Sequence, residues 1–336
     1  VRVPADPRRA PTHVTRLEDL WWCPWRTFLG RVLRLEPAPD ALAALPDVDG
    51  AMLGQVVHAV LEQVVVRAGL PTGVSLEELA DAVPATVAWP DETEVEMLLD
   101  QASRQVMRER GIATAGFARL LAERARPVVE RIRDVEWGEA RRLSGVLGAE
   151  VRGRVQLGTS LPRELHFRAD RVDRAPDGAF VLVDYKAGRP LSTASKETTR
   201  RDHLQQQLAQ GKRLQVAAYA RAGGSGRYVF GHPESDLAAA RFHVADGEVE
   251  AMAALDAAAD ALVAAWEAGA FPPRLVHSDL ARSGPACDFC ELAEACVQSD
   301  SGSRRRLVAW LRAEGRPADA VEVAAHRLVE QARWTG

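Results

Sequence analysis

Three ionisable residues, Asp170, Asp184 and Lys186, lie on what the sequence predicts to be one β-hairpin. The turn signal Pro176-Asp177-Gly178 separates two strand-like runs, and a turn centred on Asp177 places Asp170 opposite Asp184. Like charges on directly opposed residues are destabilising unless something neutralises them, and a hard divalent cation does so. With an ammonium group beside the metal to handle an attacking water, this set suits metal-dependent hydrolysis of phosphodiesters.

Side chains alternate between the two faces of a strand, so Asp184 and Lys186 are predicted to share one face and Tyr185 to point to the other. Surface ion pairs on an edge hairpin are the alternative interpretation. The continuous apolar run Phe180-Val-Leu-Val183 indicates instead a strand buried on both faces, where charged residues need a functional reason. We therefore expect a catalytic cleft at this hairpin.

The composition is that of an ordinary globular protein. The 336 residues are 47% hydrophobic and 27% charged, which is ample for a large core with one substantial insertion. The formal net charge of -4 shows no basic excess, so any contact with nucleic acid must come from a local patch. No apolar run is long enough to span a bilayer and no signal-peptide pattern begins the sequence, so we expect a cytoplasmic protein without a membrane partner.

The sequence changes from helical to alternating strand patterns at about residue 143, which predicts a sheet there. Strands are predicted at Val146–Leu157, Glu164–Arg174, Ala179–Lys186 and Gly226–Phe230. Helices are predicted at Ala51–Val66, Leu204–Ala222 and Val249–Ala268, with a polar stretch before the second. Residues from about 75 to 140 read as a helical insertion, and the tail from 301 to 336 as one or two amphipathic helices.

Four further side chains are candidates for the site. His58 stands on the first long helix one turn after Gly54, where a missing side chain lets a substrate approach closely. Gln215 and Tyr219 are four residues apart on a helix, so they share a face and suit contacts to phosphate or bases. Glu150 on the first strand could add a carboxylate. For each of them an ordinary core or surface role is the alternative.

The four cysteines form a second signal: Cys23 near the start, and Cys287, Cys290 and Cys296 clustered near the end. Four thiolates can hold an iron–sulfur cluster or zinc, and either would tie the two ends of the domain together. Zinc sites usually use two short paired motifs, whereas here one ligand is distant and three are unequally spaced, which favours [4Fe–4S]. Zinc in an interaction domain and two disulfides are the alternatives; nothing marks the chain as secreted.

Taken together, these residues resemble the RecB-like branch of the PD-(D/E)XK nucleases, in particular iron–sulfur members such as the AddB nuclease domain and the CRISPR adaptation nucleases. The resemblance covers most of the chain. It rests on the following segments in this order: Cys23-Pro24, Gly54-x₃-His58, Asp170, Asp184-Tyr185-Lys186, Gln215-x₃-Tyr219 and the C-terminal cysteine triplet.

The resemblance implies an α/β restriction-endonuclease-like core, a mixed central sheet flanked by helices, over residues 1–300. It also implies that His58, Asp170, Asp184 and the main-chain carbonyl of Tyr185 bind Mg²⁺ or Mn²⁺. Lys186 would orient or help deprotonate the attacking water and offset charge in the transition state. His58, Gln215 and Tyr219 would join the catalytic residues, and the four cysteines would bind a structural [4Fe–4S] cluster.

The sequence therefore predicts a metal-dependent deoxyribonuclease that acts on single strands or duplex ends in DNA repair and recombination. No G-x-x-x-x-G-K-[ST] phosphate loop is found in the sequence, so it works alone or as the nuclease part of a helicase–nuclease. Lys196, Arg200 and Arg201 are candidates for contacts to the DNA backbone. The competing hypothesis is a DNA-binding scaffold that keeps the fold and the cluster but does not cleave.

Overall fold

A computed structural model describes residues 11–36, 48–114, 116–159, 162–273, 287, 290–296, 300–312 and 320–325. The strands are β1 (Thr12–His13), β2 (Ala85–Ala88), β3 (Arg142–Leu157), β4 (Arg163–Arg174), β5 (Phe180–Lys186), β6 (Gly224–Phe230) and β7 (Arg241–Ala245). The longer helices are α1 (Val14–Trp22), α3 (Gly50–Arg67), α4 (Glu92–Glu109), α5 (Phe117–Glu136), α6 (Glu197–Ala209), α7 (Leu214–Gly223), α8 (Val249–Ala258) and α11 (Ser301–Arg312). The described residues also include two short helices, α2 (Pro24–Thr27) and α9 (Ala264–Ala268).

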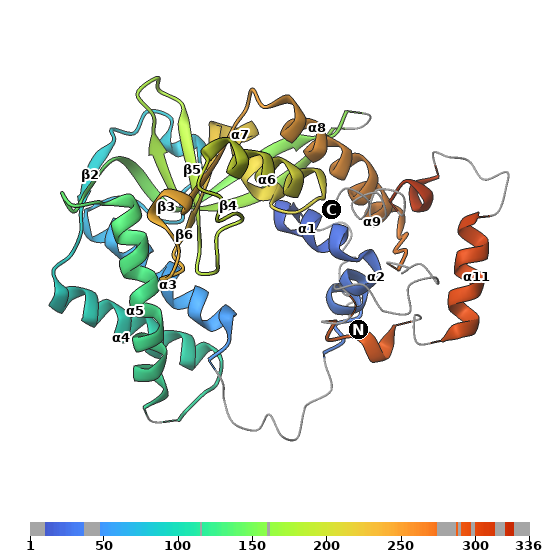
Figure 1. The fold of residues 1–336 in the computed structure, drawn as a ribbon, viewed down its shortest axis with the longest axis horizontal. Helices are drawn as coiled ribbons and strands as arrows, with labels where there is room; N and C mark the ends of the chain where they lie inside the picture. Colours follow the sequence, from blue (N-terminus) through green and yellow to red (C-terminus); the bar gives the residue numbers. More distant parts are fainter. Residues whose placement is uncertain are drawn as a thin grey trace, which may run out of the picture.

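The strands form one mixed sheet. In the described residues its order is β2-β3-β4-β5-β6-β7, with β1 added beside β4. The pairs β5–β6 and β1–β4 are parallel, and the other pairs are antiparallel. Helices α3, α4 and α5 lie on one side of the sheet, and α1, α6, α7 and α8 lie on the other (Figure 1). This confirms the predicted α/β fold with a mixed sheet flanked by helices.

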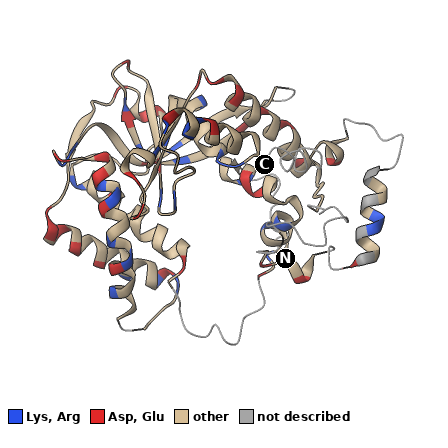
Figure 2. Cartoon of the chain, in the orientation of Figure 1, with Lys and Arg blue, Asp and Glu red and all other residues tan. Residues whose placement is uncertain are grey.

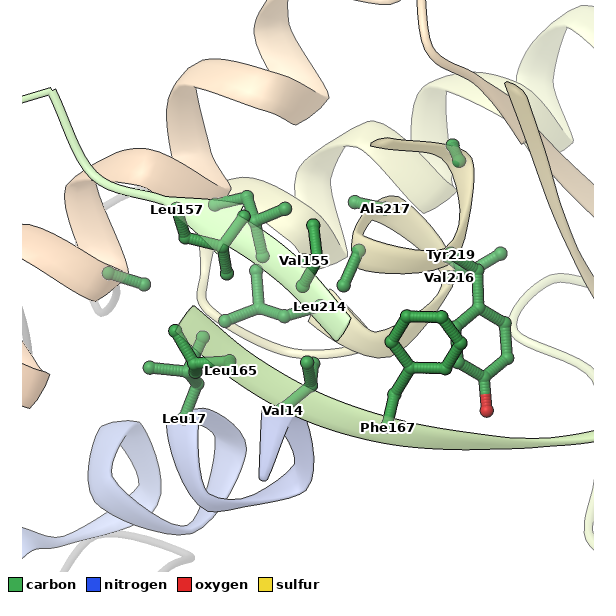
Figure 3. Close-up of a cluster of buried hydrophobic side chains, with 14 of the residues drawn as sticks. Val14, Leu17, Val155, Leu157, Leu165, Phe167, Leu214, Val216, Ala217 and Tyr219 are labelled. Atoms are coloured by element: carbon green, nitrogen blue, oxygen red, sulfur yellow. The ribbon is translucent and has the colours of Figure 1, made fainter. Parts of the chain in front are cut away.

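Two hydrophobic cores fill the layers on either side of the sheet. The first packs α1 and α7 onto β3 and β4 through residues such as Leu17, Val155, Phe167 and Val216 (Figure 3). The second packs α3, α4 and α5 onto the sheet and includes the Tyr185 ring. The sheet therefore lies between two apolar layers, and a polar side chain on it needs either a partner or access to solvent.

The β4–β5 hairpin has the predicted register. The pairs run from Arg174 opposite Phe180 to Arg171 opposite Val183, so one further step places Asp170 and Asp184 opposite one another. Gly178 takes a φ of 90°, a value that glycine adopts without strain, and its N–H donates to the Ala175 carbonyl at 2.9 Å. The turn chemistry of the sequence thus fixes which residues meet across this hairpin.

The predicted single helix over Leu204–Ala222 is wrong, because the structure divides it into α6 and α7. The break includes Gly211, whose φ is 69°. A Cβ there would lie 1.5 Å from Cδ2 of the Trp21 ring, so the close approach of α1 requires a glycine. The polar stretch before residue 204 is also shorter than expected, because α6 already begins at Glu197.

The predicted insertion at 75–140 is not purely helical. It contains α4 and α5, but it also supplies β2, which pairs antiparallel with β3 at the edge of the sheet. The strand is four residues long, and its Val87 carbonyl accepts a hydrogen bond from the Trp137 indole at 3.1 Å. Because a contact with a distant tryptophan stabilises this strand, the residues around it in the sequence, which have a helical pattern, do not indicate a strand.

The tail begins with α11, as the sequence predicts, and the proposed domain division at residue 300 stays a prediction. Among the described residues, no helix has both the length and the apolar character that crossing a bilayer requires.

Candidate active site

Asp170 lies at the centre of the site. Its Oδ1 is 3.1 Å from Nδ1 of His58, which α3 brings over the sheet. Its Oδ2 accepts the Tyr185 main-chain N–H at 2.6 Å. On β5, Asp184 Oδ2 and Lys186 Nζ form an ion pair of 2.7 Å. The structure thus brings together His58, Asp170, Asp184 and Lys186, four of the predicted site residues.

Glu150 completes a group of possible metal ligands. Ala149 pairs with Arg171 and Val151 with Ala169, so Glu150 lies opposite Asp170 on the neighbouring strand. Ligand atoms of Glu150, Asp170 and His58 all lie within 4.8 Å of one another. The sequence singled out Glu150 only weakly, because a glutamate in a strand is common.

The backbone at Glu150 is strained. Its φ is 50°, in the left-handed region that residues other than glycine rarely adopt. Ala149 packs into one core and Val151 into the other, although residues two apart in a strand normally share a face. The strand therefore switches its faces at Glu150. Such strain is often found at functional sites, where the surrounding structure holds it in place.

Burial and crowded negative charge shift the ionisation of this group. Burial raises the pKa of Asp184 to about 6, and the charge of Asp170 acts in the same direction. Burial likewise raises the pKa of Glu150 to about 7, again with a contribution from Asp170. Burial alone would lower the pKa of His58, but the Asp170 carboxylate outweighs it and raises the value to about 9. The carboxylates at this site are thus poorly solvated, and a bound cation would offset the repulsion between their charges.

Gln215 and Tyr219 share a face of α7 as predicted, but the Tyr219 ring does not reach the cleft. Its hydroxyl is fully buried, accepts a hydrogen bond from Gln215 Nε2 at 2.6 Å and donates to the main-chain carbonyl of Arg168 at 2.5 Å. The Tyr219 hydroxyl instead binds the main chain of β4 two residues before Asp170, and the predicted phosphate or base contact of Tyr219 stays a prediction. Gln215 does line the cleft.

A buried ionic network supports the hairpin from the side opposite Asp184. The Arg171 guanidinium is fully buried and donates to the Tyr185 hydroxyl, to Glu136 and to Asp173. Arg241 Nε donates to the other oxygen of Glu136 at 2.7 Å. This network holds the Tyr185 ring while the Tyr185 N–H holds Asp170. Sequence reasoning missed it, because Arg171 and Glu136 are far apart in the chain.

A cleft of about 900 Å³ opens beside this group. His58, Glu150 and Asp170 line it, together with Gly54, which the sequence had marked as a point of close approach. No atom lies within 4 Å of the position that a Cβ on Gly54 would occupy, so a ligand can approach the backbone there. The possible metal ligands are therefore open to a substrate.

A family model described as the PD-(D/E)XK nuclease superfamily matches residues 13–297, most of the chain. The chain belongs to the PD-(D/E)XK nuclease superfamily. No curated protein matches the sequence. Among solved structures, the crystal structure of SSO0001 is similar with a TM-score of 0.29 and 12% identity, over 72% of this chain and 93% of that one. A likeness this weak does not bear on the site or its substrate.

Membership of the PD-(D/E)XK nuclease superfamily implies nuclease activity and a divalent metal. The residues fit such an ion: carboxylates suit Mg²⁺, and a neutral imidazole beside them is acceptable to Mn²⁺. His58 would have to lose its proton as the metal binds, because only neutral imidazole is a ligand. Whether the Tyr185 carbonyl joins them stays a prediction.

The four cysteines of this PD-(D/E)XK protein are all half-buried. Cys23 lies between α1 and α2, where its Sγ accepts the Arg26 N–H at 3.5 Å. A Cβ on Gly30 would lie 3.7 Å from Leu292 Cδ1, so the segment between Cys290 and Cys296 packs beside the N-terminal helices. This neighbourhood fits a group shared by the two ends of the chain, while the iron–sulfur cluster itself stays a prediction.

The three basic residues suggested for DNA contacts lie at the start of α6. Lys196 is the N-cap residue of that helix. Arg200 Nη1 donates to the carbonyls of Ala194 at 2.9 Å and Ser195 at 2.8 Å, and Arg201 lies 3.5 Å from Glu248. Arg200 is thus engaged by the backbone before the helix, whereas the Arg201 side chain stays 64% exposed, and a role of these residues in binding DNA stays a prediction.

Proposed function

We propose that this PD-(D/E)XK protein is a Mg²⁺- or Mn²⁺-dependent deoxyribonuclease that hydrolyses phosphodiester bonds in single strands or at duplex ends. The observation that carries the proposal is the meeting of His58, Glu150 and Asp170 within 4.8 Å at an open cleft, beside the Asp184–Lys186 ion pair. An acidic group with a histidine and a lysine is the donor set for a metal-assisted attack of water on phosphate.

His58, Glu150, Asp170 and Asp184 would hold the metal, which supplies Lewis acidity and lowers the pKa of a bound water. Lys186 extends from the same strand as Asp184 and donates hydrogen bonds only, so it orients the attacking water or a phosphate oxygen. As a fixed cation it also stabilises the negative charge that grows on the phosphate in the transition state. The Asp184–Lys186 ion pair keeps this ammonium group beside the Asp184 carboxylate.

We propose a structural [4Fe–4S] cluster on Cys23, Cys287, Cys290 and Cys296. The support is the donor set and the close approach of Leu292, which lies between Cys290 and Cys296, to Gly30, which follows Cys23 by seven residues. A role in repair or recombination, alone or with a helicase partner, rests on the resemblance to iron–sulfur nucleases and on the lack of a phosphate loop in the sequence.

The test is cleavage of end-labelled single-stranded and double-stranded DNA by the full chain, purified without oxygen and supplied with Mg²⁺ or Mn²⁺. We expect metal-dependent cleavage by the parent and none by Asp184→Ala. Asp100→Ala is the matched control, because Asp100 is exposed and forms only an ion pair with Arg104 at 2.8 Å on α4. Folding of each variant is checked by its thermal melt.

Two results would overturn the proposal. If Asp184→Ala cleaves as fast as the parent and the control, the activity belongs to a contaminant or another site. If the parent binds DNA but never cleaves it with either metal, the chain is a scaffold that has kept the nuclease fold.

A further inference from the structure

The two strands that carry Glu150 and Asp170 continue beyond them with an open polar face. Arg152 lies opposite Arg168, the next outward-facing positions after the two acids. His166 is the next outward-facing residue of β4 after Arg168. His13 on β1 lies beside it, with the ring centroids 5.9 Å apart. We call Arg152 and Arg168 the arginine rung, and His13 and His166 the histidine rung.

Both rungs line the same cleft as the metal ligands. Outward positions along a strand repeat every two residues, about 7 Å, so the rungs form an ordered track that starts at Asp170. The intervening residues Leu165, Phe167 and Ala169 are buried in the core, which fixes the orientation of the track. This polar face is therefore built on a rigid part of the sheet.

The arginine rung places two guanidinium charges directly opposite one another, with Glu150 paired to Arg168 and Glu78 within electrostatic reach of Arg152. Like charges directly opposed across an antiparallel pair destabilise a sheet. Arg168 is 68% exposed and its Nε lies 2.7 Å from Glu150, while Arg152 forms no ion pair within the described part of the chain. Two arginines side by side in a cleft are expected where an anion binds between or along them.

The opposite wall of the cleft has no lysine or arginine among the described residues that line it, and its one basic side chain there is His58 on α3. This wall is formed by α3 and α4, which contribute Gln55, Glu62, Gln105 and Glu109. Among the described lining residues, lysine and arginine occur only on the wall formed by β3 and β4, which we call the sheet wall. Basic and acidic residues are otherwise interspersed over the molecule (Figure 2), so the segregation is a property of this cleft. The glutamates of this wall repel phosphate. Gln105 donates to Glu109 at 2.9 Å and Gln55 accepts from Arg110 at 3.4 Å, and the remaining donor and acceptor groups of these two amides can hydrogen-bond to bases.

We propose that the sheet wall binds the sugar–phosphate backbone of the cleaved strand. The phosphodiester next to the scissile one contacts the arginine rung, the one after it contacts the histidine rung, and the bases face the α3–α4 wall. This inference rests on the proposed nuclease function. The ligand class we infer is a single polynucleotide strand, of which a cleft of about 900 Å³ would hold only a few nucleotides.

The test measures binding of a fluorescein-labelled oligothymidylate to the full chain in EDTA, over a range of salt concentrations. For single strands each neutralised phosphate adds about 0.7 to the slope of log K against log salt. We therefore expect the double variant Arg152→Ala/Arg168→Ala to lose about 1.4 from that slope and at least about tenfold in affinity. Arg152→Lys/Arg168→Lys keeps the charges and should restore most of the slope.

Arg119→Ala is the matched control, because Arg119 is exposed on α5 and forms an ion pair of 2.9 Å with Glu123 away from the cleft. Its slope should equal that of the parent. If the folded double-alanine variant keeps the parent's slope of log K against log salt, the proposed binding of the DNA backbone along the sheet wall is wrong. It is also wrong if the slope falls and the double-lysine variant does not restore it. Cleavage by the parent, measured separately with Mn²⁺, tells these outcomes apart from failure of the nuclease proposal, in which the parent does not cleave at all.

Discussion

Glu136 makes the most quantitative test of how the hairpin is supported. Its side chain is 1% exposed and forms ion pairs with Arg171, Arg227 and Arg241. Burial alone would raise the pKa of Glu136, but the three guanidinium charges outweigh it and lower the value from 4.5 to about 2. A shift of this size corresponds to about 3 kcal/mol of folding free energy at neutral pH.

The sign follows from the lowered pKa in the folded state. The stabilisation is present above the unfolded pKa of 4.5 and is lost as the pH falls towards 2. Glu136→Gln removes the charge at every pH, so it should cost about 3 kcal/mol at pH 7 and about half of that near pH 3. A cost of this order also agrees with the roughly 3–5 kcal/mol for breaking a buried ion pair.

The assay is urea-induced unfolding of both proteins between pH 7 and pH 3, followed by circular dichroism. Glu123→Gln is the matched control on the same helix, because its ion pair with Arg119 is exposed and should contribute less than about 1 kcal/mol. A cost for Glu136→Gln that is equally large at pH 7 and pH 3 would refute the electrostatic reasoning, because loss of packing does not depend on pH. A cost no larger than that of the control would refute the network itself.

Three other variants test separate parts of the structure. Gly211→Ala should cost at least about 2 kcal/mol in urea unfolding, because it adds backbone strain and a clash with Trp21; Gly178→Ala, which meets only the strain, should cost less. Cys290→Ala should lower both the iron content and the melting temperature of the anaerobic protein, and an unchanged melt would contradict a structural cluster. Tyr219→Phe keeps the ring but removes the hydrogen bond to β4, so cleavage should slow without loss of bound metal; unaltered cleavage would show that this hydrogen bond is dispensable.

The sequence was most informative where the decisive signal is local. Pro176-Asp177-Gly178 determines the turn, the turn sets the register, and the register brings Asp170 and Asp184 together. The alternation of faces then correctly places the Tyr185 ring in the core opposite Lys186. These steps need only neighbours in the chain, which is why they could be predicted.

Other features depend on contacts between distant segments. The break between α6 and α7 exists because Trp21 packs where a side chain on residue 211 would lie, and nothing near residue 211 indicates that. The Tyr219 hydroxyl donates to the Arg168 carbonyl and so joins α7 to β4, which helical spacing alone does not reveal. The network around Glu136 joins α5 to β4 and β7, so no window of sequence contains it.

Glu150 shows why the alternation of side chains between the two faces of a strand does not predict the group of possible metal ligands. A left-handed residue inside a strand costs about 1–2 kcal/mol, and glycine would remove that cost. The chain instead carries a glutamate whose carboxylate faces Asp170 at the point where the strand changes faces. Beyond this point the outward face of β3 and β4 is open to the cleft, and before it β3 is covered by the second core. In the proposed site the same residue would supply a metal ligand, and it turns the strand so that the arginine rung faces the cleft, which would give a strained conformation a functional reason to persist.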